Sequence, residues 1–288
     1  MYWFEFGGNK IGRLYVEGPE AEEFPKWRLI SKYKGEFPCH FTLVYVNPGA
    51  YNAPETAAIV ASNKNIGTWF LLGGVGNNCL QYVDRNILYK CPMLQEKSFF
   101  AAVVVKGSQI YTFGGYENVE KCQLKSCEVY SIDKDKWFPN EEVQLLEARS
   151  QASACLFDDA VIFVFGGYNK EHGTLSSIER YDIAKKRVTP VELKMLQPLR
   201  RFATIKISTT KVLILGGISR LSKESDAVYC FDAEEGQYSM EVLDKIDRAG
   251  AVDYPVILDS IGSLHLFVEN ATGTSPPFRT VYSFLEYS

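Results

Sequence analysis

The chain has 288 residues, of which 46% are hydrophobic, enough to bury a core and too many for a disordered tail. Its formal net charge of −4 lacks the basic excess that draws proteins to nucleic acid or anionic lipid. No segment approaches 18 uncharged apolar residues, and the N-terminal residues show no secretory pattern, so we expect no nucleic-acid partner, no membrane insertion and no targeting signal.

In chain order, the first expected strands are irregularly spaced. Apolar runs predict strands at 2–6, 13–17 and 27–31, and a further apolar alternation covers 40–46. The segment 47–54 is rich in Asn, Pro and Gly and predicts a protruding loop. The alternation at 40–46 is expected to complete a neighbouring unit.

From residue 57 onward, the expected elements repeat. Each unit opens with an apolar strand, continues with an apolar run that ends in two glycines, and then has a third strand that contains a tyrosine. The opening strands are expected at 57–61, 99–105, 152–157, 202–207 and 254–258. The glycine doublets close the runs 2–8, 68–74, 110–115, 161–167 and 212–217, and a sixth copy at 264–269 has lost both glycines.

The tyrosines of the third strands recur in step with the doublets, at Tyr15, Tyr82, Tyr130, Tyr181, Tyr229 and Tyr282. A bulky residue follows seven positions after three of them, at Tyr89, Trp137 and Val188. No stretch shows a sustained 3.6-residue apolar period with caps, so no long helix is expected.

A repeated glycine doublet at a constant phase favours a propeller over a two-sheet sandwich. Propeller blades pack radially and bury their faces against their neighbours, and glycine suits the inner turns where backbones approach closely. The pattern of apolar run, Gly-Gly, Tyr and Trp resembles the kelch repeat, and Gly114, Gly115, Tyr130 and Trp137 match it in full. We therefore expect one all-β domain over 1–288: a six-bladed kelch-type β-propeller of four-stranded antiparallel blades, closed by combining N- and C-terminal strands.

The cysteines and histidines offer little chemistry. The seven cysteines are scattered without a Cys-x-x-Cys pair, which indicates reduced thiols and a cytoplasmic location. His40 and His265 lie in strand-like runs and His172 in a polar loop, and the spacing of Cys122 and Cys127 matches no zinc pattern. No nucleophile elbow, phosphate loop or metalloprotease motif is present, so we expect no catalytic residues, no cofactor and no metal.

The loops between second and third strands vary in length and polarity, which is typical of a binding face. Basic residues precede the first strands, at Lys97, Arg149, Arg200, Arg201 and Arg248. The resemblance to kelch proteins implies that Arg149 and Arg200 line the channel mouth and meet acidic side chains of a partner. A role in capping strands or pairing with neighbouring blades is the alternative. Tyr116 and Tyr168 follow the glycine doublets and are expected either to contact a partner peptide or to pack at the rim.

The function expected from this sequence is a non-catalytic scaffold that binds an acidic or mixed-charge segment of another protein on one face. Three alternatives stay open: a structural subunit of a cytoskeletal or multi-protein assembly, a propeller-based small-molecule isomerase or lyase, and the substrate-recognition subunit of a ubiquitin ligase. The oligomeric state does not follow from the sequence.

Overall fold

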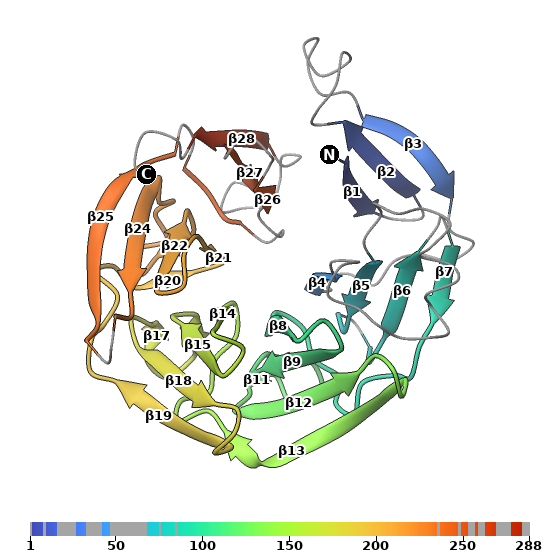
Figure 1. The fold of residues 1–288 in the computed structure, drawn as a ribbon, viewed down its shortest axis with the longest axis horizontal. Helices are drawn as coiled ribbons and strands as arrows, with labels where there is room; N and C mark the ends of the chain where they lie inside the picture. The colour runs from blue at the N-terminus through green and yellow to red at the C-terminus, as the bar shows by residue number, and fades with distance from the viewer. Residues whose placement is uncertain are drawn as a thin grey trace.

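The computed structural model describes residues 2–7, 10–15, 27–32, 42–46, 68–74, 76–83, 86–234, 237–246, 249–252, 257–258, 263–268 and 278–283. It shows an all-β propeller in which antiparallel sheets are arranged radially around an axis (Figure 1). Four of its sheets have four strands each. Within the described residues, no helix has the length and apolar character needed to cross a bilayer.

We name each four-stranded blade after its third strand. The β6 blade contains β4 (Thr42–Val46), β5 (Thr68–Leu72), β6 (Cys79–Val83) and β7 (Asn86–Tyr89). The β12 blade contains β8 (Ala101–Val105), β9 (Gln109–Phe113), β12 (Ser126–Ser131) and β13 (Lys136–Gln144). The β18 blade contains β14 (Ser153–Phe157), β15 (Val161–Phe165), β18 (Ile178–Asp182) and β19 (Arg187–Val191). The β24 blade contains β21 (Ala203–Lys206), β22 (Lys211–Leu215), β24 (Ala227–Asp232) and β25 (Ser239–Lys245).

The two terminal sheets have three described strands each. The N-terminal sheet contains β1 (Tyr2–Gly7), β2 (Lys10–Tyr15) and β3 (Trp27–Lys32), and the C-terminal sheet contains β26 (Ile257–Leu258), β27 (Ser263–Val268) and β28 (Phe278–Ser283). Six blades of four strands were expected, but only four such blades are present among the described residues. The terminal sheets are separate there, so the expected closure stays a prediction.

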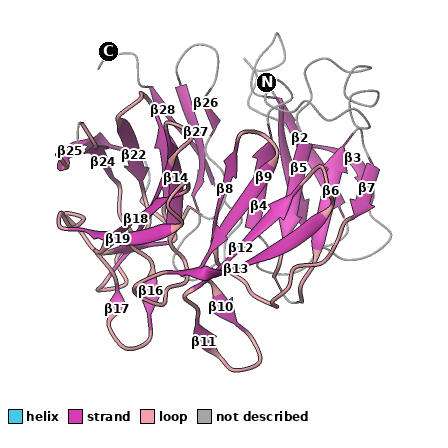
Figure 2. Cartoon of the chain, turned by 60° about the horizontal axis from the view of Figure 1, so that its bottom comes forward, coloured by secondary structure: helices cyan, strands magenta, loops and turns pink. Residues whose placement is uncertain are grey.

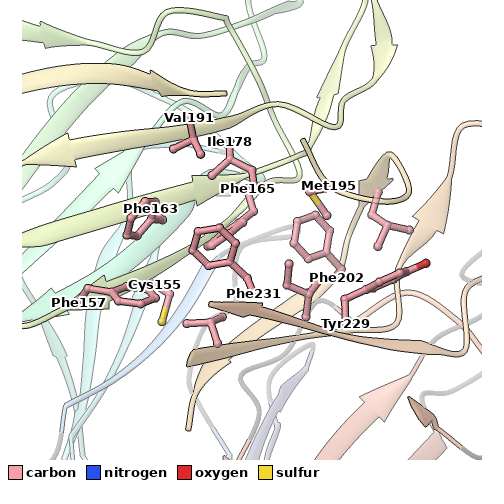
Figure 3. Packing of buried hydrophobic residues seen from close by; sticks show 13 residues of the cluster. Cys155, Phe157, Phe163, Phe165, Ile178, Val191, Met195, Phe202, Tyr229 and Phe231 are labelled. Atoms are coloured by element: carbon pink, nitrogen blue, oxygen red, sulfur yellow. The ribbon is translucent and has the colours of Figure 1, made fainter. Parts of the chain in front are cut away.

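The second strands of the blades are largely apolar because neighbouring blades cover both of their faces. In β22, Val212, Leu213, Ile214 and Leu215 are all fully buried, although successive side chains point to opposite faces. Between the β18 and β24 blades, the Phe231 ring packs edge-on against the Phe165 ring, with 5.1 Å between the ring centroids (Figure 3). Aromatic pairs of this geometry add about 0.5–1.5 kcal/mol beyond their buried area.

The glycine doublets lie where one blade meets the segment that crosses to the next. Gly114 has a φ of 63°, and a Cβ placed on it would lie 2.3 Å from the carbonyl oxygen of Arg149. The next glycine, Gly115, donates its N–H to that same oxygen at 2.8 Å. The doublet is therefore required both by the turn and by the close approach of the crossing segment.

The strand register corrects two sequence expectations. The first strand of the β6 blade is β4, which pairs with β5, whereas the expected strand at 57–61 and the loop at 47–54 lie outside the described residues. Of the bulky residues seven positions after a tyrosine, Trp137 pairs with Tyr130, whereas Tyr89 pairs with Leu80.

The second correction concerns the tyrosine of the β24 blade. Val228 pairs with Leu215 as Ile178 pairs with Phe165, so Phe231 holds the position of Tyr181. Tyr229 takes the position that Glu179 has in the β18 blade. Because side chains two positions apart share one face of a strand, either residue satisfied the apolar pattern of the sequence.

Candidate partner-binding face

Two β-hairpins project from one side of the ring: β10 (Tyr116–Glu117) with β11 (Cys122–Gln123), and β16 (Tyr168–Asn169) with β17 (Gly173–Thr174) (Figure 2). Each hairpin begins directly after a glycine doublet and pairs with a crossing segment, through the bridges Ser98 to Tyr116 and Ser150 to Tyr168. In the next repeat, β20 (Leu199–Arg200) pairs with β23 (Ile218–Ser219) in the same way. We call the surface formed by these hairpins and by the crossing segments 97–99, 149–151 and 199–201 the hairpin face.

Backbone hydrogen bonds define equivalent positions in the crossing segments. Gly74, Gly115 and Gly167 donate their N–H groups to the carbonyl oxygens of Lys97, Arg149 and Leu199, at 3.0, 2.8 and 2.8 Å. These three acceptor residues therefore occupy one position of the repeat. The arginine that matches Arg149 in the sequence was expected to be Arg200, but it lies one residue later.

Arg149 is fully buried, so it does not line an accessible channel mouth as expected. Its guanidinium pairs with Glu179 and donates to the carbonyl oxygen of Gly166 at 2.9 Å and to Ser177 Oγ at 3.0 Å. The Glu179 carboxylate in turn accepts the backbone N–H groups of Leu146 and Glu147, at 2.7 and 3.1 Å. Arg149 thus ties its crossing segment to β18, which is the alternative role considered for it.

Lys97 repeats this arrangement in the β12 blade. It is fully buried, and its Nζ lies 3.3 Å from Glu128 Oε1 and donates to Thr112 Oγ1 at 3.2 Å. Burial lowers the pKa of the Lys97 ammonium, and the charge of Glu128 offsets part of that shift. Lys97, like Arg149, is therefore out of reach of a partner.

Arg200 lies on the hairpin face and is only half-buried. Its Nη1 donates to Gln151 Oε1 at 3.1 Å, and its guanidinium carbon lies 5.6 Å from the centre of the Tyr168 ring. Its Nε is buried without a hydrogen-bond partner in the described part of the chain. Burial lowers the pKa of Arg200, the neighbouring charge of Arg201 lowers it further, and Tyr168 opposes the shift.

A chain of backbone hydrogen bonds links the crossing segments around the axis. Gln151 donates its N–H to Phe99 O at 2.7 Å, Arg201 donates to Gln151 O at 2.9 Å, and Val252 donates to Arg201 O at 2.7 Å. Phe99, Gln151 and Arg201 all have positive φ, at 53°, 58° and 54°. Gln151 was missed in the sequence, although it follows Arg149 by the same two positions that separate Phe99 from Lys97.

The other expected site residues have mixed positions. Tyr168 and Tyr116 are half-buried at the bases of their hairpins, and the ring of Tyr168 is in contact with Arg200. Arg248 lies outside the described residues. The structure thus brings together Tyr168, Arg200 and Arg201, and it separates them from the buried Lys97 and Arg149.

His172 lies near a serine and a carboxylate, but not in the order of a catalytic triad. Its Nδ1 is 2.7 Å from Glu147 Oε1, and Ser177 Oγ donates to the other oxygen of that carboxylate at 2.9 Å. A base that activates serine must itself touch the hydroxyl, whereas here the carboxylate lies between the two. These contacts fasten the β16–β17 hairpin and Ser177 to Glu147, just before the crossing segment 149–151.

One cluster in the described residues has metal-ligand chemistry: Glu117, Glu120 and Cys122, whose ligand atoms lie within 4.8 Å of one another. Glu117 accepts the N–H groups of Val119 and Glu120 inside the β10–β11 hairpin. Asn169 has the equivalent role in the β16–β17 hairpin, where it accepts the N–H of Glu171 at 2.8 Å. The carboxylate of Glu117 therefore stabilises the turn of the hairpin, and this role explains its position without a metal ion.

Comparison with known proteins gives consistent matches. Residues 100–247 match the model of the KLHDC2/KLHL20/DRC7 Kelch-repeats domain. An F-box/kelch-repeat protein of Arabidopsis thaliana is 30% identical over 93 residues, which are 32% of this chain and 22% of that protein. Beta-scruin of Limulus polyphemus is 26% identical over 165 residues, which are 53% of this chain and 17% of that protein. The matches thus span less than a quarter of these relatives' own lengths.

A solved structure, that of YjhT, has a TM-score of 0.57 with 13% sequence identity, covering 69% of this chain and 68% of the other. At this identity the likeness extends to the fold alone.

Proposed function

Since this chain belongs to the kelch-repeat family, we propose that it is a non-catalytic interaction module that binds a segment of another protein on the hairpin face. The residues that would contact the partner are Gln151, Tyr168, Arg200, Arg201 and, at the neighbouring hairpin, Tyr116. Arg149 and Lys97 support this surface from beneath through their buried ion pairs.

The environment of Arg200 is the observation that carries the proposal. Its guanidinium is half-desolvated, lies beside a second arginine and has a buried Nε without a hydrogen-bond partner among the described residues. An incoming carboxylate would accept from the guanidinium fork and relieve the repulsion by Arg201. The partner segment is therefore acidic, and the Tyr168 ring offers flat contact area beside it.

The test uses a capped Glu-Ser-Glu-Ser-Glu peptide and its counterpart with Gln in place of Glu. The wild-type chain should bind the acidic peptide more tightly, and Arg200→Met should weaken that binding about tenfold or more, since a desolvated charged hydrogen bond contributes roughly 1.5–3 kcal/mol. Arg187→Met is the matched control, because Arg187 is exposed on the outer strand β19. Equal binding of the two peptides, or equal loss in both variants, would contradict the proposal.

The similarity to F-box/kelch-repeat proteins favours a second candidate function, the substrate-recognition subunit of a ubiquitin ligase. In that case the same hairpin face would hold the substrate. Affinity purification of the full chain from native cells, followed by mass spectrometry, should then recover ubiquitin-ligase subunits in the wild type and in Arg200→Met alike. Substrates should be recovered only with the wild type.

We also propose that residues 1–288 form one domain of six blades, in which the terminal strands complete a shared blade. The sheets β1–β3 and β26–β28 each have three described strands in the ring, which supports this count. Six free thiols among the described residues support a reducing, cytoplasmic location.

A further inference from the structure

The outer strands of three blades differ at one position of the ladder. Opposite Glu128 in the β12 blade is Pro139, and opposite Glu179 in the β18 blade is Pro190. In the β24 blade the same position, opposite Tyr229, is held by Val242. The β12 and β18 blades thus have a proline where the β24 blade has a residue with a backbone N–H.

The prolines show which way the backbone points at this position. Proline has no N–H, and within a sheet it is confined to edge positions whose nitrogen faces away from the partner strand. The N–H and C=O of Val242 therefore face outward from β25, and those of Met240, two residues earlier, do so as well. Pro139 and Pro190 block such pairing on the other two edges.

The edge of β25 is accessible. β25 runs along the outer rim of the ring (Figure 1), and the Val242 side chain is 59% exposed. The regular part of the edge is Ser239 to Val242, because the ladder shifts register after Val242. The β7 edge differs, since β7 has only four residues and ends at the corresponding position, Tyr89.

The side chains along this edge specify what an added strand would carry. Met240 and Val242 share one face, and Met240 packs against the core cluster between the β18 and β24 blades. Ser239 and Glu241 share the opposite face, where Glu241 is exposed and has no ion-pair partner among the described residues. Lys245, at the end of β25, is already 3.4 Å from Asp226.

We propose that the Ser239–Val242 edge binds an extended segment of a partner protein in which basic and β-branched apolar residues alternate. The segment adds a strand to the β24 blade through the outward backbone groups of Met240 and Val242. Its apolar residues lie beside Val242 and its basic residues beside Glu241. This site is on the outer rim and is separate from the hairpin face, so each of the two can fail without the other.

The test uses a capped peptide of alternating lysine and valine, with fluorescence anisotropy as the readout. Val242→Pro should weaken binding about tenfold or more, since the outward N–H of residue 242 is replaced by a ring that blocks the approach of an added strand. The variant should fold, because proline occupies the same ladder position in the β12 and β18 blades. An unchanged urea midpoint verifies this. Glu241→Lys should also weaken the lysine–valine peptide and should strengthen a glutamate–valine peptide.

A second arm uses only the wild-type chain. The same lysine–valine peptide with N-methyl groups on alternate backbone nitrogens keeps its charge but cannot extend the ladder, so it should bind at least about tenfold more weakly. Equal binding of the methylated peptide, or equal binding to Val242→Pro, would overturn the proposal. Sedimentation tests the remaining outcome. If the chain self-associates, Val242→Pro abolishes that self-association and no peptide binds, then the edge binds a second copy of the chain and the proposed partner is wrong.

Discussion

The second and third strands of the β18 and β24 blades pair in the same register, but the two blades stabilise the junction with their crossing segments by different chemistry. Where the β18 blade buries Arg149 against Glu179, the β24 blade buries Leu199 beside Tyr229. The Tyr229 hydroxyl, which points away from the phenylalanines in Figure 3, donates to Gln197 Oε1 at 2.7 Å. The position thus requires a filled volume and satisfied polar groups, and it does not require a charge. The substitution also leaves Arg200, one residue later, as the cation of the hairpin face.

Arg149→Leu tests this comparison with the largest expected effect. It leaves the Glu179 carboxylate buried without its cation, which should lower the free energy of unfolding by about 3–5 kcal/mol. The double variant Arg149→Leu, Glu179→Tyr copies the β24 blade and should lose less than the single variant. Urea unfolding measures both. A double variant that is less stable than Arg149→Leu would show that a leucine and a tyrosine cannot replace the Arg149–Glu179 pair in the β18 blade.

The glycine doublets offer a second contrast between the blades. A Cβ on Gly166 would lie 2.6 Å from the backbone oxygen of Leu199, whereas on Gly216 the nearest atom is the Val252 Cγ2 at 2.8 Å, at the end of a side chain. Gly166→Ala should therefore lower the free energy of unfolding by about 2–4 kcal/mol, and Gly216→Ala by about 1–3 kcal/mol. The reverse order in urea unfolding would mean that the backbone can yield at Gly166.

Tyr229→Phe measures what the Tyr229 hydroxyl contributes to the stability of the β24 blade. The ring stays buried, but the hydrogen bond from the hydroxyl to Gln197 is lost. The free energy of unfolding should fall by about 1 kcal/mol, the usual contribution of such a bond. Tyr111→Phe is a suitable control, because Tyr111 is buried in another cluster, of the β12 and β18 blades. No change in Tyr229→Phe would indicate that filling the volume is sufficient.

The smallest expected effect is on the pH dependence of stability, and it concerns Lys97, the buried cation that the β12 blade has in place of Arg149. Burial lowers the pKa of Lys97 below its ordinary value of 10.5, so in the window below 10.5 the unfolded chain binds more protons than the folded chain. The contribution of Lys97 to stability therefore rises with pH through that window. In the Lys97→Arg variant, the guanidinium at position 97 stays protonated throughout that pH window. The wild type should gain stability relative to Lys97→Arg between neutral pH and 10.5 in urea titrations, and parallel curves would contradict the shift.

The sequence was sufficient to predict the repeat and most strands, because glycine doublets and apolar runs are local signals. The same pattern singled out Tyr130 and Trp137 as matching the kelch repeat, and the structure pairs these two residues across β12 and β13. The site was harder to predict, because ladder register decides which residue is buried. Arg149 and Arg200 look equivalent in the sequence, yet the hydrogen bond from Gly167 shows that Leu199, not Arg200, occupies the position equivalent to Arg149.

The most direct test of partner binding on the hairpin face is the Nε–H resonance of Arg200, observed by NMR in a chain labelled with ¹⁵N-arginine and assigned by its loss in Arg200→Lys. We expect this resonance to shift when the capped Glu-Ser-Glu-Ser-Glu peptide is added and to stay in place with the Gln counterpart. If the peptide binds and the Arg200 resonance does not move, the acidic segment is held elsewhere and the proposed site is wrong.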